Sequence, residues 1–235
     1  MKTFGLSVRW IGGHYLCPEL VPRGAKVVDI GANRGVFIEA SRRVFEAEVY
    51  AVEPTPELFQ SLQNELGLHK IHAAISHFNG RSAFHIRDNC EASSLLVENL
   101  KGVMESIEVE TLTLPALLDR LGLSGIDILK VDAEGAELKM FDVCPQEFMG
   151  KISQICVEFH EWMGIGTRKD VEGVIQKINS AGFRSFSLVR GNYQAVLFVN
   201  RRYMSAWQYW CTWLRVWVPR VLISGRRKIL SSKVF

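Results

Sequence analysis

Residues 26–35 read Lys-Val-Val-Asp-Ile-Gly-Ala-Asn-Arg-Gly. An apolar run that ends at a glycine predicts a buried strand over residues 26–30, and residues 36–45 predict an amphipathic helix. Gly31 and Gly35 permit a tight turn and a close approach of a ligand to the backbone, and the following helix offers free N–H groups. The Gly-x-x-x-Gly spacing fits the fingerprint of nicotinamide-binding loops poorly.

The rest of the chain repeats this alternation of strand and helix, which is typical of βαβ units on a parallel sheet. Further strands are expected at residues 48–52, 71–75, 126–131 and 153–159, and helices at about 56–66, 115–121 and 169–181. A hairpin is expected over residues 77–87 around Asn79-Gly80, and an antiparallel pair over residues 183–189 and 194–199. The sequence therefore predicts an α/β doubly wound sheet of about seven strands, mostly parallel with a C-terminal antiparallel hairpin.

The net charge of +3 hides a division along the 235 residues. Residues 201–235 hold eight basic and no acidic residues, so the first 200 residues carry a net charge of −5. We expect an N-terminal segment (1–25), a single domain (26–200) and a basic, Trp-rich tail (201–235). The composition, 48% hydrophobic, is that of a globular protein and excludes a disordered chain. Five scattered cysteines and an apolar start interrupted by Arg9 predict a cytoplasmic location without a signal peptide.

Acidic side chains follow two of the predicted strands at their carboxyl ends, where open parallel sheets bind ligands. Glu53 ends the second strand and can accept both hydroxyls of a ribose. The segment 130–137 holds Lys130, Asp132, Glu134 and Glu137, a costly concentration of charge unless the groups pair or handle a substrate. The alternatives are a solvated charge at the strand end for Glu53 and a structural salt-bridge cluster for residues 130–137.

Three segments together, VDIGANRG, AVEPTPELFQSLQNEL and IDILKVDAEGAE, resemble the FkbM-type methyltransferases. The resemblance spans about residues 26–141 and continues more weakly to about residue 200; Ala133 departs from it by being small. It implies the class I Rossmann-like fold with S-adenosylmethionine as cofactor. It further implies that Glu53 holds the ribose, that Ala74 lines the adenine pocket and that Asp132 faces the sulfonium. The residues that it implies for the amino-acid part of the cofactor lie on the glycine loop: Asp29, Gly31, Ala32, Asn33 and Gly35.

Methyl transfer to a hydroxyl requires a base within hydrogen-bond reach of the acceptor. The candidates are Asp132, Glu134 and His160; the alternative for His160 is a structural hydrogen bond. Lys130 either lowers the pKa of a carboxylate, binds an acidic group of the substrate, or simply pairs with Glu134 or Glu137. A divalent metal held by Asp132 and Glu158 is conceivable, but the sequence offers no third ligand and we expect no metal.

The predicted function is O-methylation of a hydroxyl on a sugar, glycan or small natural-product-like acceptor. The alternative is a module that binds S-adenosylmethionine, or docks on nucleic acid or a membrane, without this catalysis. Nucleic-acid methylation is disfavoured, because residues 132–135 read Asp-Ala-Glu-Gly where amino-group methylases usually show Asn/Asp-Pro-Pro-aromatic.

The tail carries an apolar stripe at helical spacing, which Pro219 should kink or end. The stripe consists of Trp207, Trp210, Trp213/Leu214, Trp217/Val218 and Val221. Arg215 and Arg220 argue against a membrane span. The pattern favours a helix lying on an anionic membrane, here the inner face, with packing on the domain, packing on a dimer partner and nucleic-acid binding as alternatives.

Overall fold

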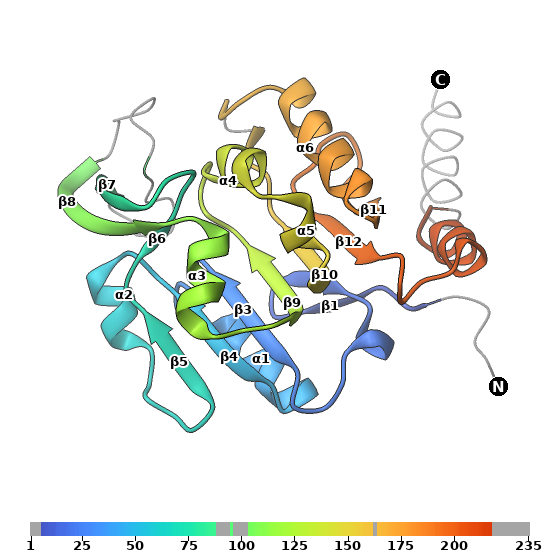
Figure 1. Cartoon of the computed structure of the whole chain (residues 1–235), viewed down its shortest axis with the longest axis horizontal. Coiled ribbons are helices and arrows are strands. Elements are labelled where there is room, and N and C mark those ends of the chain that lie inside the picture. Colours follow the sequence, from blue (N-terminus) through green and yellow to red (C-terminus); the bar gives the residue numbers. More distant parts are fainter. Residues whose placement is uncertain (1–5, 88–94, 96–102, 162–163, 218–235) are drawn as a thin grey trace, which may run out of the picture.

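The computed structural model describes residues 6–87, 95, 103–161 and 164–217. Its centre is a seven-stranded sheet in the order β11-β12-β10-β9-β3-β4-β5 (Figure 1). In chain order the strands are β3 (Lys26–Ile30), β4 (Glu48–Val52), β5 (Leu68–Ile71), β9 (Ile126–Val131), β10 (Ile152–Val157), β11 (Phe183–Ser187) and β12 (Val196–Asn200). β12 runs antiparallel to both neighbours, and the other pairs are parallel. The predicted α/β sheet with a closing antiparallel pair is confirmed.

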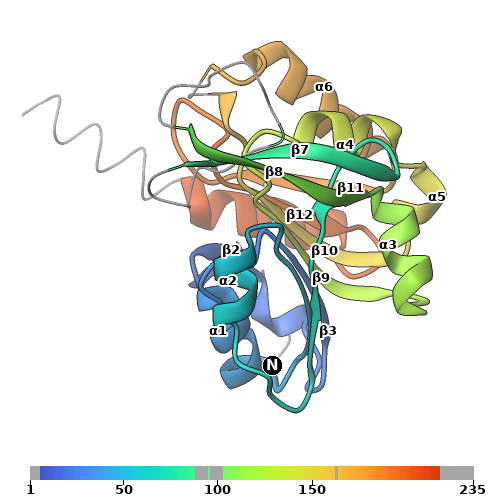
Figure 2. The same cartoon turned by 90° about the vertical axis from the view of Figure 1, so that its left-hand side faces the viewer.

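Helices cover both faces of this sheet (Figures 1 and 2). Successive side chains of a strand point to opposite faces, so Val28 and Val27 of β3 belong to different cores. The core around Val28 includes α3 (Leu114–Leu121), α4 (Glu137–Val143), α5 (Gln146–Met149) and α6 (Arg168–Ser180). The core around Val27 includes α1 (Val36–Phe45), while α2 (Pro56–Ser61) follows β4.

The N-terminal segment packs on the central sheet through a hairpin of β1 (Arg9–Ile11) and β2 (His14–Leu16), followed by the short 3₁₀ helix η1 (Pro18–Leu20). Two hydrogen bonds tie it to the buried Gln154 of β10. The Cys17 N–H donates to Gln154 Oε1 at 2.9 Å, and Gln154 Nε2 donates to the Cys17 carbonyl at 3.1 Å. These bonds satisfy a polar side chain in the core and fix where the hairpin lies.

A second sheet of three strands, in the order β6-β8-β7, is inserted between β5 and α3. Its strands are β6 (Ala74–Ile75), β7 (Gly80–Arg87) and β8 (Val103–Leu112). The hairpin predicted over residues 77–87 is therefore wrong, because residues 80–87 form a single strand paired with β8 and residues 77–79 are a bend that precedes it. Asn79 Oδ1 accepts a hydrogen bond from the Thr113 N–H at 2.7 Å, so Asn79 lies where β7 begins and not in a two-residue turn.

Other boundaries also differ from the sequence predictions. The strand predicted over residues 71–75 is divided between β5 and β6, which belong to different sheets. The helix predicted to run to residue 66 ends at Ser61, and α4 and α5 were not predicted. The tail forms a helix over residues 206–217; the predicted stripe residues Val218 and Val221, with Pro219, lie outside the described residues. Within the part of the chain that is described, no helix has the length and apolarity needed to cross a bilayer.

Candidate active site

A cleft opens at the carboxyl ends of β3, β4 and β9, beneath the three-stranded sheet. Its walls come from segments far apart in the sequence, since parallel strands bring their carboxyl ends to one edge. The lining residues are Ile30, Gly31, Asn33, Val52, Glu53, Pro54, Thr55, Leu58, Ala73, Ala74, Ile75, Phe84, Leu95, Asp132, Ala133 and Glu134. Polar side chains stand at the strand ends. Half of the apolar side chains come from the inserted sheet and its flanks, and the other half from β3, β4, α2 and the segments that follow β4 and β9.

The loop from β3 to α1 turns sharply at three residues with positive φ: Gly31 (75°), Asn33 (50°) and Gly35 (80°). Gly31 is required for a second reason, because a Cβ there would lie 1.9 Å from the carbonyl oxygen of Asp132. The Gly31 and Ala32 N–H groups donate to the Val52 carbonyl at 3.0 and 3.1 Å. The loop is thus held against both β4 and the segment after β9.

Glu53 is buried at the end of β4 and is fixed by two backbone donors. The Asn33 N–H donates to Oε2 and the Thr55 N–H to Oε1, both at 2.8 Å. Because the side chain also lines the cleft, its carboxylate is oriented before any ligand arrives. Such a carboxylate can accept further hydrogen bonds from hydroxyl groups.

Asp29 and Lys130 form a fully buried ion pair behind the glycine loop. They are register partners of the adjacent strands β3 and β9, and Lys130 Nζ lies 3.2 Å from Asp29 Oδ1 and 3.6 Å from Asp132 Oδ2. Burial raises the pKa of Asp29 to about 6, opposed by Lys130. Burial alone would lower the pKa of Lys130, but Asp29 and Asp132 raise it above its usual range. Lys130 therefore pairs with these two carboxylates, not with Glu134 or Glu137.

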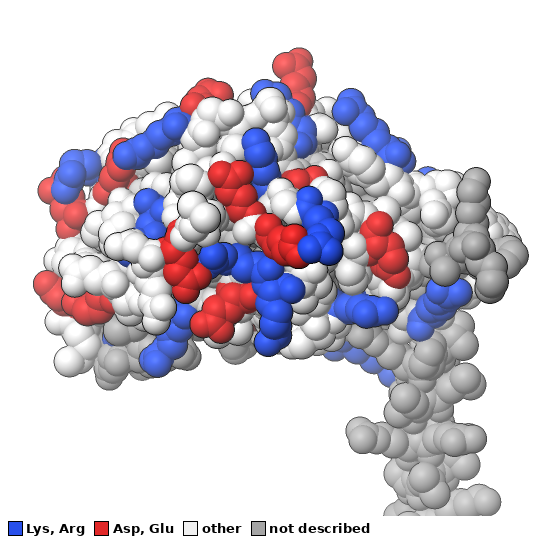
Figure 3. All heavy atoms as spheres, turned by 90° about the horizontal axis from the view of Figure 1, so that it is seen from below, with Lys and Arg blue, Asp and Glu red and all other residues white. Residues whose placement is uncertain are grey.

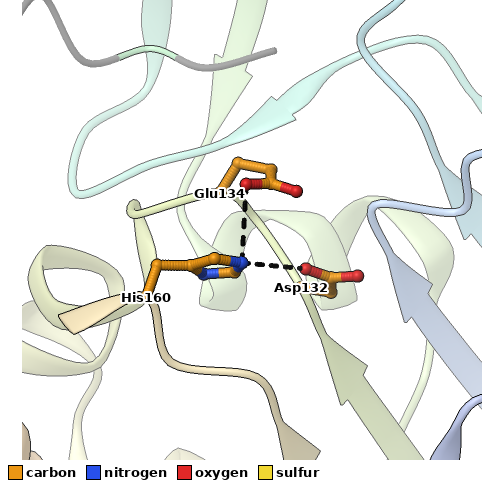
Figure 4. Close-up of side chains that lie close together, drawn as sticks. All are labelled: Asp132, Glu134 and His160. Atoms are coloured by element: carbon orange, nitrogen blue, oxygen red, sulfur yellow. Dashed lines mark ion pairs between the residues drawn. The ribbon is translucent and has the colours of Figure 1, made fainter. Parts of the chain in front are cut away.

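His160, just after β10, meets Asp132 and Glu134 at the cleft (Figure 4). Its Nε2 lies 3.6 Å from Asp132 Oδ1 and 3.4 Å from Glu134 Oε2. Its Nδ1 lies 3.2 Å from Oε1 of the buried Glu137, which also accepts from the N–H groups of Ala133 (2.8 Å) and Gly135 (3.2 Å). Glu137 thus fixes both the loop after β9 and the orientation of the imidazole.

Glu134 and His160 both have pKa values above their ordinary ones. Burial raises the pKa of Glu134 to about 7, partly offset by His160. Burial tends to lower the pKa of His160, but Glu137, Glu134 and Asp132 raise it to about 9. Glu134 also has a φ of 49°, uncommon for a non-glycine residue. Perturbed pKa values and an unusual backbone conformation together are typical of a functional site.

One ligand atom from each of Asp132, Glu134 and His160 lies within 4.8 Å of the others, a spacing that a metal ion could bridge. The pair considered from the sequence was Asp132 with Glu158. Glu158 is not part of this trio among the described residues, and its Oε1 accepts from Gln194 Nε2 at 3.2 Å.

The structure brings most of the sequence-predicted site residues to one place. Those that line the cleft are Gly31, Asn33, Glu53, Ala74, Asp132 and Glu134. Asp29, Lys130 and His160 lie behind them, in contact with Asp132 or the glycine loop, whereas Ala32 and Gly35 shape the turn.

Sequence reasoning missed Phe84 and Leu95, which come from the inserted sheet and its connection, and the role of Glu137. Phe84 and Leu95 carry no motif signal, because their position depends on the pairing of β7 with β8. For Glu137, a signal existed: a glutamate two residues after the glycine of the charged segment, at the start of a helix where its carboxylate can accept backbone N–H groups.

The chain is similar in sequence to a known protein family and to known proteins. The family profile described as "Methyltransferase FkbM domain" matches residues 29–185. Methyltransferase sdnD of Sordaria araneosa is 26% identical over 192 residues, covering 66% of this chain and 73% of that protein. Methyltransferase 1 of Beauveria bassiana (strain ARSEF 2860) is 25% identical over 169 residues, covering 61% and 68%. The structure of Aeropyrum pernix fibrillarin with natively bound S-adenosyl-L-methionine has a TM-score of 0.40 and 11% identity, covering 76% and 67%.

Proposed function

Since the chain belongs to the FkbM family of S-adenosylmethionine-dependent methyltransferases, we propose that it methylates a hydroxyl group of a sugar, glycan or small natural-product-like acceptor. The observation that carries this proposal is the position of Glu134. Its carboxylate stands in the cleft with a pKa of about 7, beside Asp132 and across from the glycine loop. A base with this pKa is suited to a hydroxyl, which is a weak nucleophile at neutral pH.

The residues around the cleft fit a cationic cofactor. Asp29 Oδ2 and Asp132 Oδ1 are buried without a hydrogen bond from any described residue. Lys130 Nζ lies 3.2 Å from Asp29 Oδ1 and 3.6 Å from Asp132 Oδ2, so one ammonium group faces two carboxylates. A ligand with a sulfonium and an ammonium group would add positive charge beside these carboxylates.

Each part of the cofactor has a matching group in this chain. The glycine loop with Asp29 would hold the amino-acid part, and the Glu53 carboxylate would accept the ribose hydroxyls. Ala74, Phe84 and Leu95 offer an apolar wall for the adenine. Asp132 would lie next to the sulfonium.

S-adenosylmethionine supplies an electrophilic methyl group, and the chain's own residues align and activate the acceptor. Glu134 would accept the hydroxyl proton as the acceptor oxygen forms its bond to the methyl carbon and the carbon–sulfur bond breaks, leaving its electron pair on sulfur. His160, held by Glu137, keeps the Asp132 and Glu134 carboxylates in place. Alignment is the larger part of catalysis in such a displacement.

The proposal is tested by a transfer screen with methyl-labelled S-adenosylmethionine over sugars, lipid-linked glycans, small hydroxylated compounds and RNA, with and without EDTA. We expect label on a hydroxyl oxygen of one of the first three classes. Calorimetric binding of the cofactor without transfer to any class would favour a binding module. Transfer to RNA alone would overturn the choice of acceptor. Loss of transfer in EDTA, restored by Mn²⁺, would assign the Asp132, Glu134 and His160 trio to a metal.

Replacing Glu53 by Gln is expected to weaken cofactor binding about 10- to 100-fold, because the amide cannot serve both backbone donors and the ribose hydroxyls. At saturating cofactor, kcat should change little, since Glu53 is not part of the cluster of Asp132, Glu134 and His160. Calorimetry gives the Kd, and steady-state kinetics gives kcat. Glu57→Gln, on the exposed side of neighbouring α2, is the matched control and should bind like the wild type. An unchanged Kd in Glu53→Gln would remove Glu53 from the cofactor site.

The pH profile of kcat/KM is expected to be bell-shaped. Glu134 has to be deprotonated to accept a proton, so the rate should rise as pH increases through about 7. His160 has to be protonated to hold the two carboxylates, so the rate should fall as pH increases through about 9. Rates measured from about pH 6 to about pH 10 test this. In Glu158→Gln the rising limb should remain; its loss there would transfer the base role from Glu134 to Glu158.

A further inference from the structure

The tail helix over residues 206–217 is the last described element of the chain (Figure 1). It has two apolar faces. Its inner face packs on β11, β12 and the N-terminal segment through Tyr209, Trp213 and Val216. On the same face the buried Thr212 hydroxyl oxygen accepts a hydrogen bond from the Leu6 N–H at 2.9 Å. The inner face therefore already anchors the helix to the domain.

The outer face consists of Trp207, Trp210 and Leu214, which are 65%, 55% and 49% exposed. Their spacing of three and four residues puts them on one side of the helix, roughly opposite the inner face. A helix that only had to pack on its own domain would carry polar residues here. Two adjacent tryptophans left in water indicate a surface that meets another partner.

The charged residues of the tail sequence are all basic. Arg202 and Arg215 are exposed at or near the helix, and residues 218–235 add five more basic residues, with no acidic residue from 201 to the end. On the face of the domain seen from below, by contrast, acidic and basic side chains intermingle (Figure 3). The segment of sequence that carries the exposed tryptophans is thus basic throughout.

We infer that this outer face docks on the surface of an anionic lipid bilayer. Tryptophan rings are suited to the headgroup region, a leucine to the layer beneath it, and flanking arginines and lysines to anionic lipids. A second copy of this chain is a poorer partner, because a two-fold contact through this face would bring its cations against themselves. RNA would complement the basic residues of the tail, but it offers no apolar layer for Leu214.

The test is flotation of the full chain with vesicles of roughly three parts phosphatidylcholine to one part phosphatidylglycerol, compared with phosphatidylcholine alone. The wild type should float with the anionic vesicles, and less at about 0.5 M NaCl. The double variant Trp207→Ser/Trp210→Ser should bind at least about tenfold more weakly, since two large amphipathic rings are lost.

Trp10→Ser is the matched control, because Trp10 is 60% exposed but belongs to β1 and not to the tail helix. It should float like the wild type, and all variants should keep the wild-type circular dichroism and cofactor affinity. Equal flotation of the double variant and the wild type would overturn the inference. The absence of flotation of the wild type would overturn it too. In that case, a dimer that light scattering detects and the double variant disrupts would indicate a second copy of the chain as the partner. A gel shift that the double variant abolishes would indicate RNA.

Discussion

Replacing Glu134 by Gln is expected to lower kcat by about 10²- to 10⁴-fold while the affinity for S-adenosylmethionine changes little. The amide has nearly the same shape and can stay beside His160, but it cannot take a proton from the acceptor hydroxyl. The Glu134 carboxyl lies in the cleft with its pKa raised by burial to about 7, so it is the best-matched base for work near neutral pH. Single-turnover rates and a calorimetric Kd for the cofactor measure the two quantities separately.

Two comparisons make this prediction specific. Glu158→Gln, at the end of β10 with its carboxylate on Gln194, should keep wild-type kcat within a few-fold. Asp132→Ala should also abolish turnover, but by removing a partner of both Lys130 and His160, so it should alter cofactor binding as well. Near-wild-type turnover in a double Asp132→Ala/Glu134→Ala variant would refute the assignment of these carboxylates to catalysis.

Replacing Gly31 by Ala is expected to abolish cofactor binding and to lower the free energy of unfolding by about 2–4 kcal/mol. The new Cβ would lie 1.9 Å from the Asp132 carbonyl oxygen, which is backbone and cannot rotate away. Either the glycine loop or the segment after β9 has to move, and both line the cleft. Urea unfolding gives the stability change, and calorimetry gives the loss of binding.

Gly24→Ala is the control that measures the cost of a side chain at a positive φ without a collision between the new Cβ and neighbouring backbone. Gly24 has a φ of 72°, close to the 75° of Gly31, but a Cβ there would have no atom within 4 Å. This control should lose only about 1–2 kcal/mol and should bind the cofactor normally. If Gly31→Ala behaved like Gly24→Ala, the contact between the two loops would not matter for the site.

The parts of the fold that local pattern determines could be predicted from the sequence. Residues 26–30, 36–45, 48–52 and 126–131 form the expected elements, because each strand is a compact apolar run and the helix has a clear amphipathic period. The carboxyl ends of parallel strands meet at one edge of a sheet, so the sequence alone was enough to place Gly31, Glu53 and Asp132 together.

The inserted sheet could not be predicted in the same way. The Asn79-Gly80 dipeptide is a strong local turn signal, but the partner of β7 is β8, which begins at Val103. A pairing over such a distance is decided by packing and not by local propensity. The apolar wall of the cleft at Phe84 and Leu95 was missed for the same reason. The pKa values of Glu134 and His160 likewise depend on burial and on Glu137, which spacing alone does not give.

The position of Glu137 has an evolutionary consequence. Its single carboxylate accepts two backbone N–H groups and orients His160, although it lines no part of the cleft. An aspartate would be too short to reach all three groups, and a glutamine, whose amide oxygen could take the place of Oε1, would remove the negative charge that raises the pKa of His160. We therefore expect far fewer substitutions to be tolerated at Glu137 than at Lys139, on the exposed side of α4. In a lineage of such enzymes, acceptor preference can change along the cleft while this concealed side chain stays the same.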